Sequence, residues 1–248
     1  MPAASEMPAS AASPAATWAA VADYYTEKLQ RHGATPAGVD WASATGQDLR
    51  FALLLKLCDF TAPFSLNDLG CGYGAILDYL QRRHPGAGID YLGVDLSAAM
   101  VACAAQRWQH RAKTRFVTAG HPPRIADHAI ASGIFNVVPP NAAGCWTELV
   151  AGTLSELHAT TRHGFAVNFM RAIPGQPDQP GLYRTQPGPW ITYCEQTMGA
   201  TATLVEAYAL GEFTLLVHPN QVVAAPGEEE GRLAPGSATA RKAVRPSA

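Results

Sequence analysis

Three glycines and two acids carry the chemistry that this sequence suggests most directly. The stretch LNDLGCGYGA, residues 66–75, places Gly70, Gly72 and Gly74 at alternate positions just after Asp68. A short apolar run precedes the glycines and a helix-like segment follows them, so we expect a strand, a glycine turn and a helix. This arrangement brings backbone N–H groups and a helix N-terminus close to a ligand. With alanine in the last position, the spacing also fits the dinucleotide fingerprint G-x-G-x-x-G/A, so the loop alone leaves its ligand open.

The second acid, Asp95, closes a predicted strand at residues 90–95, in the stretch GVDLSAAM. A carboxylate at a strand tip can accept hydrogen bonds from both hydroxyls of a ribose. A dinucleotide site also requires an acid there, so Asp95 does not separate the ligand classes. Asp68 does separate the ligand classes, because a carboxylate beside the glycines would repel a pyrophosphate. The two acids together favour a ligand without phosphate.

Composition limits the classes of protein to which the chain can belong. Its 248 residues are 48% hydrophobic, which is enough for one α/β domain with a sizeable core. The net charge of −2 and the lack of a basic patch that could follow a phosphate backbone speak against nucleic acid as a partner. Five widely spaced cysteines without a C-x-x-C pair predict a reducing compartment, no disulfide framework and no metal site.

Localisation follows from what the sequence lacks. No apolar run reaches the roughly 18 residues of a membrane span. The N-terminal segment lacks the apolar region of a signal peptide. We therefore expect a cytoplasmic protein without a membrane partner, and the sequence leaves a homodimer open.

The periodicity of apolar residues predicts the helices and strands that would position these candidate residues. Helices are predicted at residues 18–30, 47–60, 75–80, 98–109, 141–161 and 190–198. Strands are predicted from residue 64 to the glycine loop and at 90–95, 115–118, 127–132, 164–170, 201–207 and 212–218. Alternation implies parallel pairing, and the short last connection requires an antiparallel final strand.

The predicted fold is therefore a Rossmann-like, seven-stranded, mostly parallel sheet with an antiparallel last strand and helices on both faces. Residues 18–60 form an N-terminal helical cap, and residues 61–220 form the ligand-binding domain. Composition predicts disordered tails at residues 1–17 and 221–248.

This order of elements, with these residues at the strand ends, resembles the class I S-adenosylmethionine (SAM)-dependent methyltransferases. The resemblance covers roughly residues 64–218, and the motifs D-L-G-C-G-Y-G and G-V-D-L-S-A-A-M carry most of it. The segment A-D-H-A-I-A-S-G-I-F-N and the terminal strand pair agree with it. The resemblance implies SAM as cofactor, with S-adenosylhomocysteine (SAH) as its product. Asp68 would accept from the amino group of SAM and Asp95 from its ribose.

Further site residues are implied by the resemblance. The cofactor-binding set is Tyr25, Arg50, Asp68, Gly70, Cys71, Gly72, Asp95, Leu96, Met100, Gly120, His121 and Ser132. Tyr25 and Arg50 belong to it because N-terminal helices of relatives often supply a tyrosine or an arginine to the cofactor carboxylate. The sequence departs from the family after the third strand, where His121 stands in place of the usual acid.

Candidates on the acceptor side are His121, Asn136 and Tyr183. His121 could face the substrate, Asn136 could orient an acceptor by a hydrogen bond, and Tyr183 could form a pocket wall. Methyl transfer depends mainly on positioning, so no fixed set of catalytic residues is required. The fourth strand ends in Ser-Gly-Ile-Phe, whereas enzymes that methylate the amino groups of nucleic-acid bases carry Asn/Asp-Pro-Pro-aromatic. We expect methyl transfer to an O or N atom of a small-molecule metabolite, as in secondary metabolism.

Two other functions stay open at this point. A nicotinamide-dependent oxidoreductase could use the same loop, although the chain has no Tyr-x-x-x-Lys downstream of the loop and no lysine between Lys113 and Lys242. A non-catalytic module that binds cofactor or another protein is the third candidate, since fold alone does not establish catalysis.

Overall fold

The computed structural model describes residues 13–140, 142–175, 177, 179–206 and 210–220. Within them, seven strands form one sheet in the order β3-β2-β1-β4-β5-β7-β6. The strands are β1 Phe64–Leu69, β2 Ile89–Asp95, β3 Thr114–Thr118, β4 Ala126–Ala131, β5 Thr161–Met170, β6 Ala200–Val205 and β7 Glu212–Pro219. β7 is antiparallel to both of its neighbours, β5 and β6. All neighbouring pairs among the strands β1 to β5 are parallel, as predicted.

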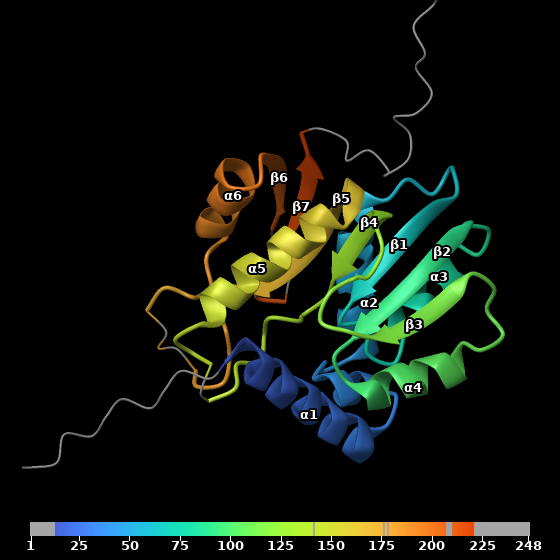
Figure 1. Cartoon of the computed structure of the whole chain (residues 1–248), viewed down its shortest axis with the longest axis horizontal. Coiled ribbons are helices and arrows are strands. Elements are labelled where there is room, and N and C mark those ends of the chain that lie inside the picture. Colours follow the sequence, from blue (N-terminus) through green and yellow to red (C-terminus); the bar gives the residue numbers. More distant parts are fainter. Residues whose placement is uncertain (1–12, 141, 176, 178, 207–209, 221–248) are drawn as a thin grey trace, which may run out of the picture.

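Helices cover both faces of this sheet (Figure 1). They are α1 Pro14–His32, α2 Ala44–Leu54, α3 Ala75–Arg83, α4 Ala98–Arg107, α5 Trp146–Ala159 and α6 Pro187–Gln196, with short 3-10 turns at Pro36–Val39 and Leu55–Leu57. One core layer joins the sheet to α5 and α6, and the other joins it to α2 and α3. Strand alternation divides the layers: in β4, Ala129 and Ala131 face the first and Ile130 the second.

Some helix boundaries in the structure differ from those predicted from the sequence. α1 begins at Pro14, because Ser13 caps it by accepting the N–H of Ala16 at 3.3 Å and proline fits the first helical turn. The helix therefore begins inside the predicted tail 1–17, whose residues 1–12 lie outside the described part of the chain. α5 begins at Trp146 rather than at residue 141. The predicted C-terminal tail, 221–248, also lies outside the described residues.

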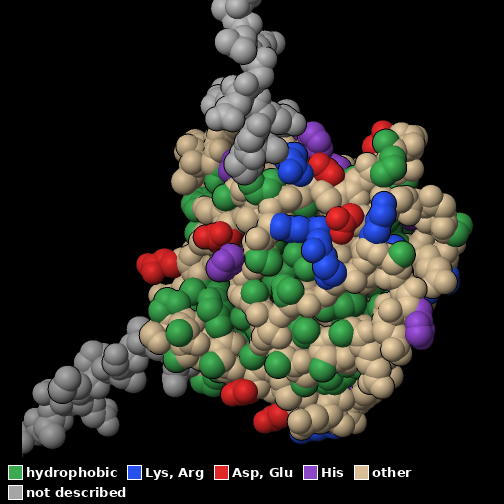
Figure 2. Space-filling view, turned by 45° about the vertical axis from the view of Figure 1, so that its right-hand side comes forward, with side chains coloured by type: hydrophobic (Ala, Val, Ile, Leu, Met, Phe, Trp, Pro, Cys, Tyr) green, Lys and Arg blue, Asp and Glu red, His purple; other side chains and the backbone are tan. Residues whose placement is uncertain are grey.

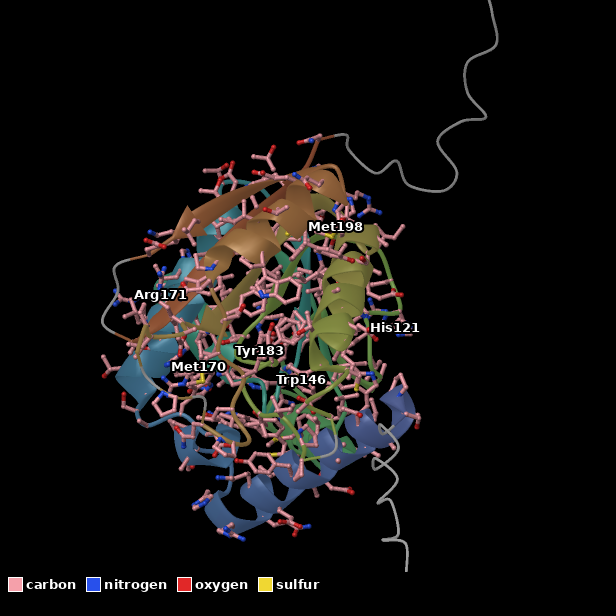
Figure 3. The ribbon with its side chains drawn as sticks, turned by 90° about the vertical axis from the view of Figure 1, so that its left-hand side faces the viewer. His121, Trp146, Met170, Arg171, Tyr183 and Met198 are labelled. Carbon is pink, nitrogen blue, oxygen red and sulfur yellow. The ribbon has the colours of Figure 1, made fainter. Side chains whose placement is uncertain are left out.

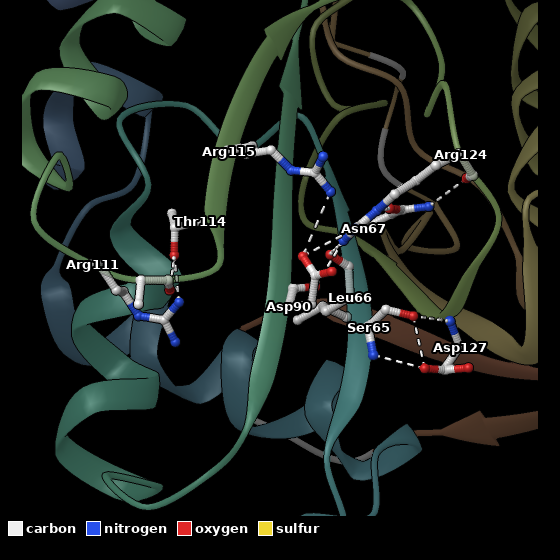
Figure 4. A network of polar contacts seen from close by, with 10 residues as sticks. Ser65, Leu66, Asn67, Asp90, Arg111, Thr114, Arg115, Arg124 and Asp127 are labelled. Atoms are coloured by element: carbon white, nitrogen blue, oxygen red, sulfur yellow. Dashed lines mark hydrogen bonds and ion pairs between the residues drawn. The ribbon is translucent and has the colours of Figure 1, made fainter.

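A polar cluster ties the first strands together near their amino ends (Figure 4). Arg124, on the loop before β4, donates to Asp90 at 2.9 Å and to the side-chain oxygen of the buried Asn67 at 3.1 Å. Asp127 accepts from the backbone and the hydroxyl of Ser65, both at 2.7 Å. These contacts satisfy buried polar groups and fix the register of β1, β2 and β4.

The outer surface mixes side chains of all kinds. Figure 2 shows basic, acidic and apolar side chains interspersed over one face of the molecule. In the described part of the chain, no helix is long and apolar enough to cross a membrane.

Candidate functional site

A cavity of about 530 Å³ lies at the carboxyl ends of the central strands. Its walls come from the glycine loop after β1, the tips of β2 and β4, and the N-terminal segments α1 and α2 with the connection between them. Open parallel sheets bind their ligands at this edge, and the size suits a small-molecule site.

The glycine loop has a backbone shape that few other residues would allow. Gly70, Gly72 and Gly74 have φ values of 75°, 54° and 77°. A Cβ on Gly70 would come within 2.2 Å of the Ile134 side chain. The loop can therefore approach both a ligand and the loop after β4 closely.

Asp95 is held at the cavity wall by backbone donors. Its Oδ2 accepts the N–H of Gly72 at 2.8 Å, and its Oδ1 accepts the N–H of Ser97 at 2.8 Å. Burial raises the pKa of this carboxyl group, while the backbone hydrogen bonds lower it. The side chain is oriented before any ligand arrives, which reduces the entropic cost of binding.

Asp68 is buried beside it at the tip of β1. The hydroxyl of Tyr91 donates to its Oδ2 at 2.6 Å. Burial raises the pKa of Asp68 to about 7, the hydrogen bond from Tyr91 opposes this, and the charge of Asp95 adds to it. Asp68 therefore suits a cationic partner, which would restore its ionised form.

Most predicted site residues line this one cavity. They are Tyr25, Arg50, Asp68, Gly70, Cys71, Gly72, Asp95, Leu96, Met100, Gly120, Ser132 and Asn136. Cys71 contributes a buried thiol whose pKa burial holds well above its usual value, so the thiol stays protonated. Tyr25 packs edge-on against Tyr24, with ring centroids 5.2 Å apart.

The structure does not bring His121 and Tyr183 into the lining. His121 is exposed and lies at the edge of the molecule in Figure 3, whereas its neighbour Gly120 lines the cavity. The backbone N–H of Tyr183 donates to the carbonyl of Asn136 at 2.9 Å, and its ring packs against the core. Tyr183 thus contacts the loop after β4 without lining the cavity.

Arg50 is paired with other side chains in the cavity wall. It is buried, and its Nε donates to both oxygens of Glu212, at 3.0 and 2.9 Å. Its guanidinium also lies over the ring of Trp41, 3.7 Å from the centroid. Glu212 in turn accepts from Asn168 at 2.8 Å.

Sequence reasoning missed Trp41 and Glu212, which both line the cavity. Trp41 stands in a turn-rich segment without periodicity, and Glu212 is the first residue of a strand, where a charge usually faces solvent. It also missed a cluster on the cap, in which Asp40 accepts the hydroxyl of Tyr24 at 2.5 Å and pairs with Lys28 at 2.5 Å. Among the described residues, no group of three or more His, Cys, Asp and Glu could hold a metal ion.

The order of the strands, with a glycine loop after β1 and acids at two adjacent strand tips, is that of the class I SAM-dependent methyltransferase fold. The sequence profile of a family described as "Methyltransferase domain" matches residues 67–163. A Mycobacterium tuberculosis (strain H37Rv) protein named "Putative methyltransferase Rv1506c" is 38% identical over 164 residues, which are 66% of this chain and 98% of that protein. The chain belongs to this methyltransferase family, and SAM is its cofactor.

Two further similarities are more limited. The trans-aconitate 2-methyltransferase of Yersinia pestis (strain Pestoides F) is 44% identical over 57 residues, 23% of this chain and 21% of that enzyme. The crystal structure of magnesium protoporphyrin IX methyltransferase from Synechocystis PCC 6803 with bound SAH matches with a TM-score of 0.58. That match covers 81% of this chain and 99% of the other, at 16% identity. At this level of identity the structural match shows the fold alone.

Proposed function

We propose that this methyltransferase transfers the methyl group of SAM to an O or N atom of a small-molecule metabolite. The observation that carries the proposal is the composition of the cavity lining, which combines carboxylates and a glycine loop with aromatic side chains and Asn136. Such a cavity offers polar partners for a nucleoside cofactor and apolar walls for a compact acceptor.

The carboxylates and the loop fit the cofactor. Asp95 would accept hydrogen bonds from the ribose hydroxyls, since its carboxylate already faces the cavity from the tip of β2. Asp68 would accept hydrogen bonds from the amino group of SAM, whose positive charge would stabilise the ionised carboxylate. Leu96, Met100 and Gly120 would form the apolar walls around the adenine ring.

The acceptor half would act mainly by positioning. SAM supplies a methyl group activated by the neighbouring sulfonium. The lone pair of the acceptor atom forms the new bond to the methyl carbon, and the carbon–sulfur bond breaks with its electron pair going to sulfur. Holding the two reactants in line is worth about 7–11 kcal/mol in favourable cases. Asn136 is the residue that we assign to orient the acceptor.

Arg50 has a narrower role in this proposal than in the sequence-based expectation. Its guanidinium is already paired with Glu212 and stacked on Trp41. A contact with the cofactor carboxylate would have to use the remaining donor atoms of the guanidinium. We therefore assign Arg50 first to holding the cavity wall and only second to the cofactor.

The test is a product search. The purified chain is incubated with SAM and pooled small-molecule extracts, and mass spectrometry follows SAH release and any compound that gains the mass of one methylene. We expect SAH and one new methylated compound to appear together, and both to fall strongly in the Asp95→Ala variant. SAM binding without SAH release in any extract would instead support a non-catalytic binding module.

A further inference from the structure

Trp41 forms a rigid wall of the cavity at the tip of β4. Its guanidinium neighbour Arg50 lies 3.7 Å from the ring centroid. The edge of the indole is close to Gly133, where an added Cβ would come within 2.4 Å of the ring. The indole is thus held by contacts on both a face and an edge.

A closed ring of contacts fixes this wall relative to the sheet. Arg50 donates to Glu212, and Asn168 donates to the same carboxylate at 2.8 Å. The side-chain oxygen of Asn168 accepts the N–H of Gly133 at 2.7 Å, and Gly133 contacts Trp41. Because every member is buried or packed, the spacing between the indole and the tip of β4 is set by the fold.

Two buried polar atoms stand at this strand tip without a hydrogen-bond partner. They are Oγ of Ser132 and Oδ1 of Asn136, counted among the described residues. Their backbone is well anchored, since Trp146 Nε1 donates to the carbonyl of Phe135 at 3.2 Å. A buried acceptor atom without a partner is destabilising, and a ligand N–H or O–H group would remove that cost.

The charges around the cavity decide between ligand classes. Four carboxylates line it, those of Asp40, Asp68, Asp95 and Glu212. Asp40 is paired with Lys28 and Glu212 with Arg50, whereas Asp68 and Asp95 are balanced only by neutral donors. The four carboxylates outnumber their cationic partners Lys28 and Arg50 by two, and SAM, whose net charge is +1, would not cancel this excess. An anionic acceptor would therefore enter against a negative potential even with the cofactor bound.

We propose that the part of the cavity bordered by Trp41, Ser132 and Asn136 is the acceptor subsite, and that it takes a flat, uncharged aromatic compound whose N–H or O–H group donates to Asn136. This inference rests on the proposed methyl transfer and narrows its substrate class. The donor atom becomes the methyl acceptor. Its lone pair forms the bond to the methyl carbon as the carbon–sulfur bond of SAM breaks with its electron pair going to sulfur, and its proton leaves to water. Stacking on the indole supplies affinity and in-plane orientation.

The inference is tested with three probes that share one bicyclic skeleton: 2-naphthol, naphthalene and 2-naphthoate. Each is titrated into the SAH-loaded chain near pH 7 and followed by ligand-observed NMR. We expect 2-naphthol to bind at least about tenfold more tightly than both others, because naphthalene lacks the donor and 2-naphthoate is an anion.

Two variants assign the binding to this subsite. Trp41→Leu should weaken 2-naphthol about tenfold, and Asn136→Leu should make 2-naphthol and naphthalene bind alike. Trp108→Leu is the matched control, because Trp108 lies outside the cavity lining. It should leave 2-naphthol binding unchanged, and SAH affinity in each variant reports whether the fold is intact.

The outcomes separate this inference from the proposed function. If the chain binds SAH but 2-naphthoate binds as well as 2-naphthol, or Trp41→Leu changes nothing, the acceptor class is overturned and the methyl transfer stands. If 2-naphthol does not bind to the SAH-loaded chain, the inference fails as well. If SAH itself does not bind, the proposed function fails first.

Discussion

The affinity for SAH should depend on pH through Asp68. Burial raises the pKa of this carboxyl group to about 7, and the Tyr91 hydroxyl at 2.6 Å partly opposes the shift. Binding of the cationic amino group requires the ionised carboxylate, so protonation competes with the ligand. With a pKa of about 7, roughly a tenth of the sites are ionised at pH 6 and roughly three quarters at pH 7.5. The dissociation constant should therefore rise about eightfold to tenfold from pH 7.5 to pH 6.

Calorimetric titration with SAH at half-unit pH steps between 5.5 and 7.5 measures this directly. Tyr91→Phe removes a hydrogen bond that lowers the pKa of Asp68, so its affinity should begin to fall at a higher pH than in the parent chain. Asp68→Asn should bind weakly at every pH and lose most of the dependence. An affinity that stays constant over this range in the parent chain would refute the placement of the amino group on Asp68.

Three other perturbations have defined outcomes. Asp95→Ala should weaken SAH binding about tenfold to a hundredfold by calorimetry, from the loss of charge-assisted hydrogen bonds worth roughly 1.5–3 kcal/mol, and an unchanged affinity in the folded variant would contradict the site. Glu212→Gln leaves the buried Arg50 without its counter-charge and should cost about 3–5 kcal/mol in urea unfolding, whereas Glu206→Gln, in a more exposed pair, should cost at most about 1 kcal/mol. Burial lowers the pKa of His128 to about 4, below its unfolded value, so the unfolded chain takes up the proton first. Stability should therefore fall by about 2 kcal/mol as the pH drops from about 6.5 toward 4, and His128→Leu should flatten this loss.

The fold was predictable because its signals are local. Alternating apolar segments located the strands, and the short connection near Gly211 required the antiparallel β7. The glycine loop and Asp95 were identified because both lie at strand ends, where backbone geometry restricts the residue types. The start of α1 was misplaced because a composition rich in alanine and proline outweighed the capping signal of Ser13 and Pro14.

The cavity wall around Trp41 and Arg50 was less predictable because it depends on long-range contacts. Arg50 and Glu212 are 162 residues apart, and no local pattern indicates that they meet. Trp41 is held by its contacts with Arg50 and Gly133. The periodicity of apolar residues in the sequence does not indicate either contact. His121 was a candidate from its position in the chain, yet the direction of its side chain depends on a loop turn that spacing does not specify.

The central claim is that the glycine loop and the two acids form a SAM site rather than a dinucleotide site. The most direct test is calorimetric titration of the purified chain with SAH and, separately, with NADH at pH 7.5. We expect micromolar binding of SAH and no binding of NADH. Binding of NADH with an affinity equal to or above that of SAH would contradict it.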